Sequence, residues 1–175
     1  LVFKTPEGVE VIKSFTFTQG DYPITVKHQV VNRSQQNWQG QMFGQLKRDN
    51  SDDPGKSSQG IFTLGTYLGG AWGTPEEPYN KLKFANFNDE KLNVEAKGGW
   101  VAMVQHYFVA AWVPQEKVMR EFYMRKLAGS NTFQAGVIIP VNEIAPGKTE
   151  TTKVDLYAGP QEQATLEKVA TGLEL

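Results

Sequence analysis

The sequence predicts a β-sandwich that ends in one α-helix. Apolar and polar residues alternate along most of the chain, which is typical of half-buried strands. Residues that favour turns interrupt this alternation at roughly ten-residue intervals, as in sandwiches of short antiparallel strands. Only the residues after Pro160 change to helical spacing, so the expected class is mainly β with a C-terminal helix.

The expected strands follow from the alternating runs in chain order. Residues 9–17 and 24–30 alternate on either side of Gly20 and Asp21, so they are expected to form an antiparallel pair. Further strands are expected at residues 38–46, 61–68, 82–84, 92–96, 122–127, 132–139 and 149–157. Loops are expected at residues 32–37, 49–60, 69–79 and 86–90, where polar residues, Gly or Pro gather.

The most apolar stretch runs from Gly98 to Pro114 and carries no formal charge apart from any proton on His106. Its roughly 14 apolar-rich residues are too few for a membrane-spanning helix, which needs about 20. The stretch is therefore expected to form one buried strand or a pair of short strands. In this interpretation His106 lies inside a strand, on the parity of Trp100 and Trp112.

The C-terminal helix is expected over residues 161–171. Pro160 suits the first position of a helix, and Gly172 favours its end. Leu166, Val169 and Leu173 fall on one face at helical spacing, so this face is expected to dock on the sandwich.

Composition favours one globular domain. The chain has 175 residues, of which 39% are hydrophobic and 21% charged, with a formal net charge of −1. Neither a nucleic-acid partner nor binding to an anionic membrane surface is expected, because there is no basic excess. The absence of cysteine excludes disulfides, thiol catalysis and cysteine-ligated zinc. Residues 1–175 contain no signal peptide and no membrane span, and both ends indicate a piece of a longer protein.

Two loop motifs resemble ligand sites only in part. Residues 55–57 read Gly-Lys-Ser, but Asn50 stands where a phosphate-binding loop needs its first Gly. Asp49, Ser51 and Asp53 have the spacing of the first calcium ligands, but Gly60 occupies the position of the closing Glu. A solvated loop is the expectation for both, and no metal or cofactor is expected.

His28 and His106 are the only histidines and the obvious candidates for acid–base chemistry. Each lies on the parity of apolar neighbours, so the favoured interpretation is a hydrogen-bonded histidine in the core or at the edge of a cleft. Trp72, Tyr79 and Trp112 are candidates for an aromatic platform that binds a sugar or a peptide. Trp72 and Tyr79 fall in the Pro-rich stretch, where exposure is expected, whereas Trp112 is expected in the core.

Several short motifs follow one another in order along nearly the whole chain. They are Phe43–Lys47, Lys97–Met103, Gln105, Tyr107–Phe108 and Ala111–Pro114, supported by Gly20–Tyr22, Lys81–Phe84 and Gly159–Pro160. In this order they resemble the large periplasmic domain of the bacterial YidC membrane protein insertases, of the YidC/Oxa/Alb family. Gly-Gly-Trp-Val-Ala-Met followed by Tyr-Phe and Ala-Trp is the most specific part of the match.

The resemblance implies a β-supersandwich of the galactose-mutarotase type with a C-terminal helix that leads toward the membrane part. It implies a single domain over residues 1–175, on the periplasmic side of the inner membrane, within a larger multi-pass protein. The implied partners are the Sec translocon, the SecD–SecF complex and nascent membrane proteins. No insertase residue is carried over to this chain. His106 departs from the expected residue, which argues against a required catalytic imidazole.

Three functions remain open from the sequence. The first is a non-catalytic domain that helps an insertase with the insertion and folding of membrane proteins. The second is a mutarotase-like sugar enzyme, which is weakened because neither histidine has an obvious carboxylate partner. The third is a carbohydrate-binding domain that uses Trp72 and Tyr79. The binding candidates are therefore Trp72, Tyr79 and His106, and no catalytic residue is assigned.

Overall fold

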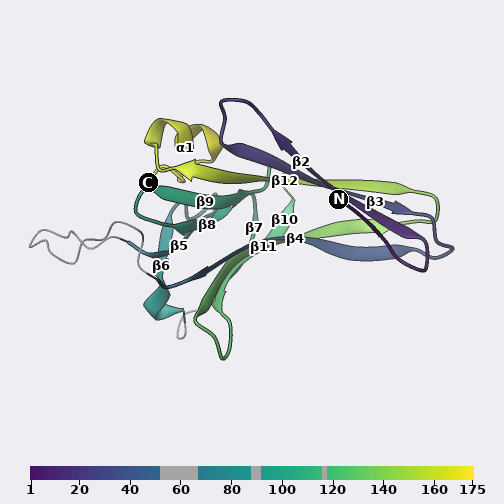
Figure 1. Ribbon diagram of the computed structural model, residues 1–175, viewed down its shortest axis with the longest axis horizontal. Coiled ribbons are helices and arrows are strands. Elements are labelled where there is room, and N and C mark those ends of the chain that lie inside the picture. The colour runs from purple at the N-terminus through teal and green to yellow at the C-terminus, as the bar shows by residue number, and fades with distance from the viewer. Residues whose placement is uncertain (52–66, 88–91, 116–117) are drawn as a thin grey trace, which may run out of the picture.

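The computed structural model describes residues 1–51, 67–87, 92–115 and 118–175, and it consists of two antiparallel sheets with a short helix on one of them (Figure 1). The strands are β1 (Val2–Lys4), β2 (Val9–Phe17), β3 (Pro23–Asn32), β4 (Trp38–Asp49), β5 (Gly69–Gly73), β6 (Asn80–Lys83), β7 (Leu92–Lys97), β8 (Trp100–Val104), β9 (Phe108–Val113), β10 (Met119–Lys126), β11 (Thr132–Ile144) and β12 (Thr149–Pro160). The helices are the 3-10 helix η1 (Phe84–Asn86) and α1 (Gln163–Val169).

The two sheets differ in size. Sheet A has eight strands in the order β1-β2-β3-β12-β9-β8-β5-β6, and sheet B has four in the order β4-β11-β10-β7. The predicted antiparallel pair of residues 9–17 and 24–30 is confirmed as β2 and β3. Of the strand expected at 61–68, residues 61–66 lie outside the described residues. The predicted mainly β sandwich with a C-terminal helix is confirmed.

The apolar stretch at residues 98–114 forms the hairpin β8–β9, and eight of the eleven residues of its two strands are buried. Val101 pairs with Trp112, and both face sheet B. Trp100 faces the opposite side of sheet A, so the expectation that Trp100 and Trp112 share one face is wrong. The expectation that His106 lies within a strand is also wrong, because His106 is exposed in the turn between β8 and β9. After this turn, residues of the opposite parity face sheet B.

The main core lies between the two sheets. Its buried members are Val9, Val26, Val30, Met42, Leu82, Phe84, Phe87, Ala96, Val101, Met103, Trp112, Phe122, Met124, Phe133, Ala135, Val137, Ile139, Val141, Ile144 and Val154. The sheets approach closely at Gly44, where an added Cβ would lie 2.6 Å from the indole of Trp112. Because a side chain at this position would overlap the ring, Gly44 allows β4 to lie directly over β9.

A second core covers the other face of sheet A. It contains Ala71, Trp100, Ala102, Val109, Ala111, Val113, Tyr157, Leu166 and Leu173. Figure 1 shows α1 on this face, on the side of sheet A away from β4 and β11. The expectation that Pro160 begins the helix is wrong, because Pro160 ends β12 and pairs with Phe108. The helices in the described ranges are all too short or too polar to cross a membrane.

A buried asparagine ties the two sheets together at the narrow end of the sandwich. The Asn32 side chain is fully buried and donates hydrogen bonds of 2.7 Å to the carbonyl oxygens of Gln36 and Ile144. Its Oδ1 accepts hydrogen bonds from the backbone N–H and the hydroxyl of Ser34. Asn32 therefore joins the end of β3 in sheet A to the end of β11 in sheet B.

His28 lies on β3 with its side chain on the same face as Val26, and it is half-buried. Its Nδ1 is buried and has no hydrogen-bond partner in the described part of the chain. Burial, followed by repulsion from the Lys13 ammonium on the neighbouring strand, lowers the pKa of His28 below its ordinary value. The folded protein therefore favours neutral His28.

We expect Asn32→Ala to lower the free energy of unfolding by about 3 kcal/mol, because it leaves the buried carbonyl group of Ile144 without this donor and removes the hydrogen bond to the carbonyl group of Gln36. Urea denaturation measures the change. The control is Asn37→Ala, which removes an exposed hydrogen bond to Glu143 and should cost less than about 1 kcal/mol. Equal losses in the two variants would contradict this role for Asn32.

Stability should fall as the pH drops below about 6.5, the ordinary histidine pKa, because the unfolded chain then binds a proton at His28 more readily than the folded chain. The stabilisation that comes from keeping His28 neutral is complete above that pH, and it is lost as the pH falls toward the lower pKa of His28 in the folded protein. Melting curves of the wild type and His28→Gln between pH 7.5 and 5 test this. The wild type should lose more stability than the variant, and parallel losses would show that His28 is not responsible.

Candidate functional site

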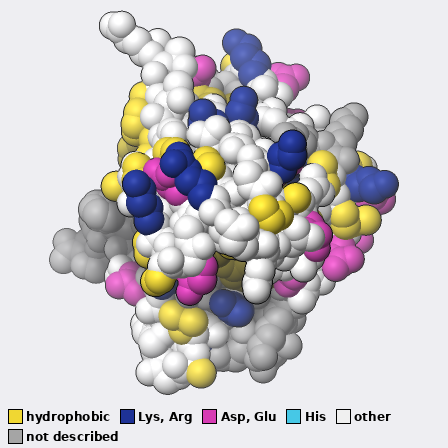
Figure 2. All heavy atoms as spheres, turned by 90° about the vertical axis from the view of Figure 1, so that its right-hand side faces the viewer, with side chains coloured by type: hydrophobic (Ala, Val, Ile, Leu, Met, Phe, Trp, Pro, Cys, Tyr) yellow, Lys and Arg dark blue, Asp and Glu magenta, His cyan; other side chains and the backbone are white. Residues whose placement is uncertain are grey.

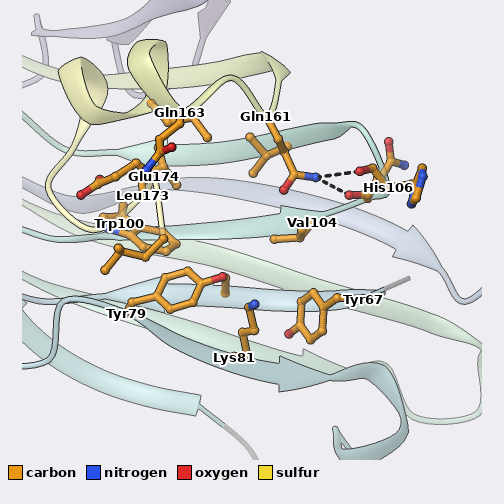
Figure 3. A pocket seen from close by; sticks show the side chains of 15 residues that line it. Tyr67, Tyr79, Lys81, Trp100, Val104, His106, Gln161, Gln163, Leu173 and Glu174 are labelled. Atoms are coloured by element: carbon orange, nitrogen blue, oxygen red, sulfur yellow. Dashed lines mark hydrogen bonds between the residues drawn. The ribbon is translucent and has the colours of Figure 1, made fainter. Parts of the chain in front are cut away.

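A pocket of about 460 Å³ lies on the helix side of sheet A, between strands β5, β6, β8 and β9 and the C-terminal residues (Figure 3). Its lining combines aromatic, apolar and polar side chains with one lysine and one glutamate. The lining residues are Tyr67, Ala71, Tyr79, Lys81, Trp100, Val104, Gln105, His106, Val109, Gln161, Gln163, Leu166, Leu173, Glu174 and Leu175. We call this cavity the helix-side pocket.

Lys81 lies between two tyrosine rings on the strand side of the helix-side pocket. Its Nζ lies 5.1 Å from the ring centroid of Tyr67 and 5.0 Å from that of Tyr79, within the range of cation–π attraction. The Tyr67 hydroxyl donates a hydrogen bond to the carbonyl oxygen of Gly70. Burial raises the pKa of Tyr67, so this hydroxyl keeps its proton at neutral pH.

The opposite wall of the pocket is made by α1 and the residues after it. The buried side chains of Leu166 and Leu173 rest on the apolar floor of sheet A. Trp100, which is also buried, donates a hydrogen bond of 3.1 Å from its indole Nε1 to the carbonyl oxygen of Thr171. These contacts hold the C-terminal residues across the strands.

Gln161 is hydrogen-bonded to the β8–β9 turn and so connects the other end of this wall to sheet A. Its side-chain amide lies within hydrogen-bond distance of the carbonyl oxygens of Gln105, His106 and Phe108. The Gln161 backbone N–H donates a further bond of 2.9 Å to the carbonyl oxygen of Tyr107. Figure 3 shows Gln161 on the helix side of the pocket, between Gln163 and His106, with Trp100 toward the other end.

The predicted aromatic platform does not form. Trp72 lies on β5, not in an irregular loop, and packs half-buried against the core between the sheets. Trp112 belongs to the same core, as expected. Tyr79 lies on the opposite face of sheet A, where it packs on Trp100 with ring centroids 6.0 Å apart. Trp72 and Tyr79 therefore cannot contact one ligand together.

The remaining sequence-predicted residues show no assembled reaction centre in the described part of the chain. His106 lines one end of the helix-side pocket, whereas Glu174 lies at the other end beside Trp100 (Figure 3). No group of three potential metal ligands was found in the described residues. Asp49 accepts hydrogen bonds from Ser51 itself, and Asp53 and residues 55–57 lie outside the described residues.

Leu166, Val169 and Leu173 all contact the second core, with Val169 only partly buried. Leu173 lies beyond α1, because Ala170 has an extended backbone and ends the helix earlier than its spacing predicts. Sequence reasoning missed Lys81, Trp100 and Gln161 as pocket residues. The alternation of Tyr79 and Lys81 was a usable signal, whereas nothing local indicated that Gln161 would meet the β8–β9 turn 55 residues away.

Gly172 is required for the C-terminal residues to dock. Its φ is +86°, and an added Cβ would lie 2.1 Å from the carbonyl oxygen of Pro78. We expect Gly172→Ala to release residues 163–175, measured as loss of amide protection there. Gly147→Ala is the control, because Gly147 also has a positive φ, +73°, but has open space around it. The control should cost only about 1–2 kcal/mol and leave the C-terminal residues protected, and release in both variants would contradict the steric argument.

Two solved structures with a similar fold have names that refer to sugar chemistry. The GH36 alpha-galactosidase AgaA from Geobacillus stearothermophilus, in complex with raffinose, matches with a TM-score of 0.62 at 11% identity, covering 94% of this chain and 24% of that one. A galactose mutarotase related enzyme from Lactobacillus acidophilus matches with a TM-score of 0.58 at 10% identity, over 90% and 66% of the two chains. At this identity the likeness confirms the galactose-mutarotase-like sandwich but gives no evidence for a shared activity.

Sequence relatives identify the family. The sequence-family model described as the YidC periplasmic domain matches residues 1–175. The "Membrane protein insertase YidC" of Dechloromonas aromatica is 46% identical over 96% of this chain, and that of Alcanivorax borkumensis is 39% identical over 100% of it. In both cases the chain spans 30% of the length of the relative. The chain therefore belongs to the YidC family of membrane protein insertases, as its periplasmic domain.

Proposed function

We propose that this domain is a non-catalytic part of a membrane protein insertase and helps membrane proteins to insert and fold beside the Sec translocon. The observation that carries the proposal is the match of the YidC periplasmic domain over all 175 residues. The proposed location is the periplasmic side of the inner membrane, within a multi-pass protein. Nascent membrane proteins are the proposed substrates, and the SecD–SecF complex is a proposed partner.

The arrangement of the helix-side pocket supports a binding or mechanical role over catalysis. His106 is exposed and ends the pocket opposite Glu174, so these two residues do not form an acid–base pair around one ligand. The separation of Trp72 from Tyr79 also removes the proposed sugar platform. The sugar-active proteins that share the fold are too distant in sequence to favour a sugar function.

The charge distribution is compatible with contacts to other proteins. Figure 2, which faces the narrow end of the sandwich, shows Lys and Arg side chains interspersed with Asp and Glu, with apolar side chains between them. This face lacks the single-sign field that a nucleic-acid partner would need, and the formal net charge of the chain is only −1. The proposed partners are therefore proteins.

The docked C-terminal residues support a mechanical connection. Leu166 and Leu173 are buried against sheet A, and Trp100 is hydrogen-bonded to Thr171. A rigidly held helix gives the domain a defined orientation relative to whatever follows α1. We propose that this helix couples the sandwich to the membrane part of the insertase.

We expect Leu166→Glu to undock α1, because it buries a charge in an apolar site, and to lower the free energy of unfolding by about 3 kcal/mol. In cells that depend on this insertase, the same variant should slow insertion of a membrane protein substrate several-fold. The control is Ala164→Glu, which places the same charge on an exposed position of α1. Unchanged melting and unchanged insertion in Leu166→Glu would contradict the proposed coupling.

A further inference from the structure

Strand β4 is an open edge beside a part of sheet A that sheet B does not cover. Sheet B ends at β4, which lies over β9. Beyond β9, sheet B still covers Val26 and Val30 of β3 and Val154 of β12, but it leaves the end of sheet A beside β4 open. Main-chain groups of residues 39–47 make no hydrogen bond outside the ladder with β11 within the described residues. An unpaired edge of about nine residues is about 30 Å long and is a template for another strand.

The uncovered surface next to this edge is an apolar groove of about 640 Å³. Its floor contains Phe108 and Ala110 from β9 and Ala158 from β12, and its wall contains Leu46 from β4. Phe108 is 55% exposed although it lies on the face of sheet A that elsewhere forms the core. We call this cavity the edge groove.

The same apolar face continues beyond the edge groove. Strand pairing places Leu156 beside Ile24 and Ile24 beside Phe17, and all three face the side of sheet B. Phe17 is 71% exposed and Phe15 is 44% exposed. Exposed apolar side chains that lie together on one face indicate an interaction surface rather than a solvent-facing one.

Charge at the edge groove is of one sign. Lys47 and Arg48 line it, and no carboxylate lines it among the described residues. The Arg48 guanidinium also donates a hydrogen bond to the carbonyl oxygen of Ser51, so Lys47 is the cation offered to an occupant. The groove therefore suits an occupant that is apolar along its length and carries an acidic group near one end. An acyl chain could fill the apolar floor, but only a polypeptide can also pair with the main chain of β4.

We propose that β4 binds an extended polypeptide segment as an added strand, whose alternate apolar side chains lie in the edge groove. The added chain would become the fifth strand of sheet B and cover the floor formed by Phe108, Ala110 and Ala158. This inference rests on the proposed function, because it takes the substrate to be an unfolded segment of a membrane protein. Its physical basis, an unpaired edge beside an uncovered apolar floor, is independent of the translocon.

The test uses the full-length insertase in nanodiscs and a labelled ten-residue peptide that alternates Val and Thr and ends in Asp. Fluorescence anisotropy measures binding, and hydrogen exchange locates it. We expect saturable binding and at least tenfold slower exchange of amides in residues 39–47. Binding without protection of β4, or no binding at all, would overturn the proposal.

A matched pair of variants tests the position of the peptide. Ala158→Trp fills the edge groove, and Thr151→Trp adds the same side chain to an exposed site on the other face of the same strand. We expect Ala158→Trp to weaken peptide binding at least tenfold and Thr151→Trp to leave it unchanged, with both variants melting like the wild type. Equal binding by the two variants would overturn the proposal. Displacement of the peptide by an acyl chain that leaves β4 unprotected would show a lipid site instead and would also overturn it.

Failure of this inference can be distinguished from failure of the proposed function. Suppose that Ala158→Trp abolishes peptide binding but that the same variant inserts membrane proteins normally in cells. This result would support the β4 site and contradict its use by the insertase. Slow insertion in Leu166→Glu, together with no peptide binding to the wild type, would support the proposed function and overturn the β4 site.

Discussion

The middle of sheet A has to be covered on both faces. Strands β8 and β9 place Val101, Met103 and Trp112 on one face and Trp100, Ala102 and Val109 on the other, and all six are buried. A strand that is apolar on both faces is stable in water only when a layer lies on each side. Sheet B supplies one layer, and α1 with the residues that follow it supplies the other.

This requirement explains why the C-terminal residues belong to the fold. Trp100 is large and buried, and its indole N–H needs an acceptor, which the carbonyl oxygen of Thr171 provides. Gly172 then passes close to Pro78 in a backbone conformation that favours glycine. The helix-side pocket is the space left between this second layer and sheet A. The edge groove has a different cause, because sheet B does not extend over the end of sheet A that lies beside β4.

Much of the fold could be predicted from local patterns in the sequence. Alternation located most strands, and helical spacing identified Leu166 and Leu173, although an extended Ala170 ends α1 earlier than the spacing indicates. The sequence does not mark the turn at His106, because residues 105–107 contain no Gly or Pro. The alternation therefore runs across the turn and predicts Trp100 and Trp112 on one face. The separation of Trp72 from Tyr79 depends on which strand each residue joins. Local spacing in the sequence does not predict which strands pair.

Because each needs the other as a covering layer, α1 and the hairpin β8–β9 should form one cooperative unit. Native-state hydrogen exchange of the domain, with and without the Leu173→Ala substitution, measures this most directly. The substitution should lower the opening free energy of amides in α1, β8 and β9 by a similar amount, about 2–4 kcal/mol, and change sheet B less. Faster exchange confined to α1, with β8 and β9 unchanged, would show that the helix merely rests on the sandwich and would contradict this cooperativity.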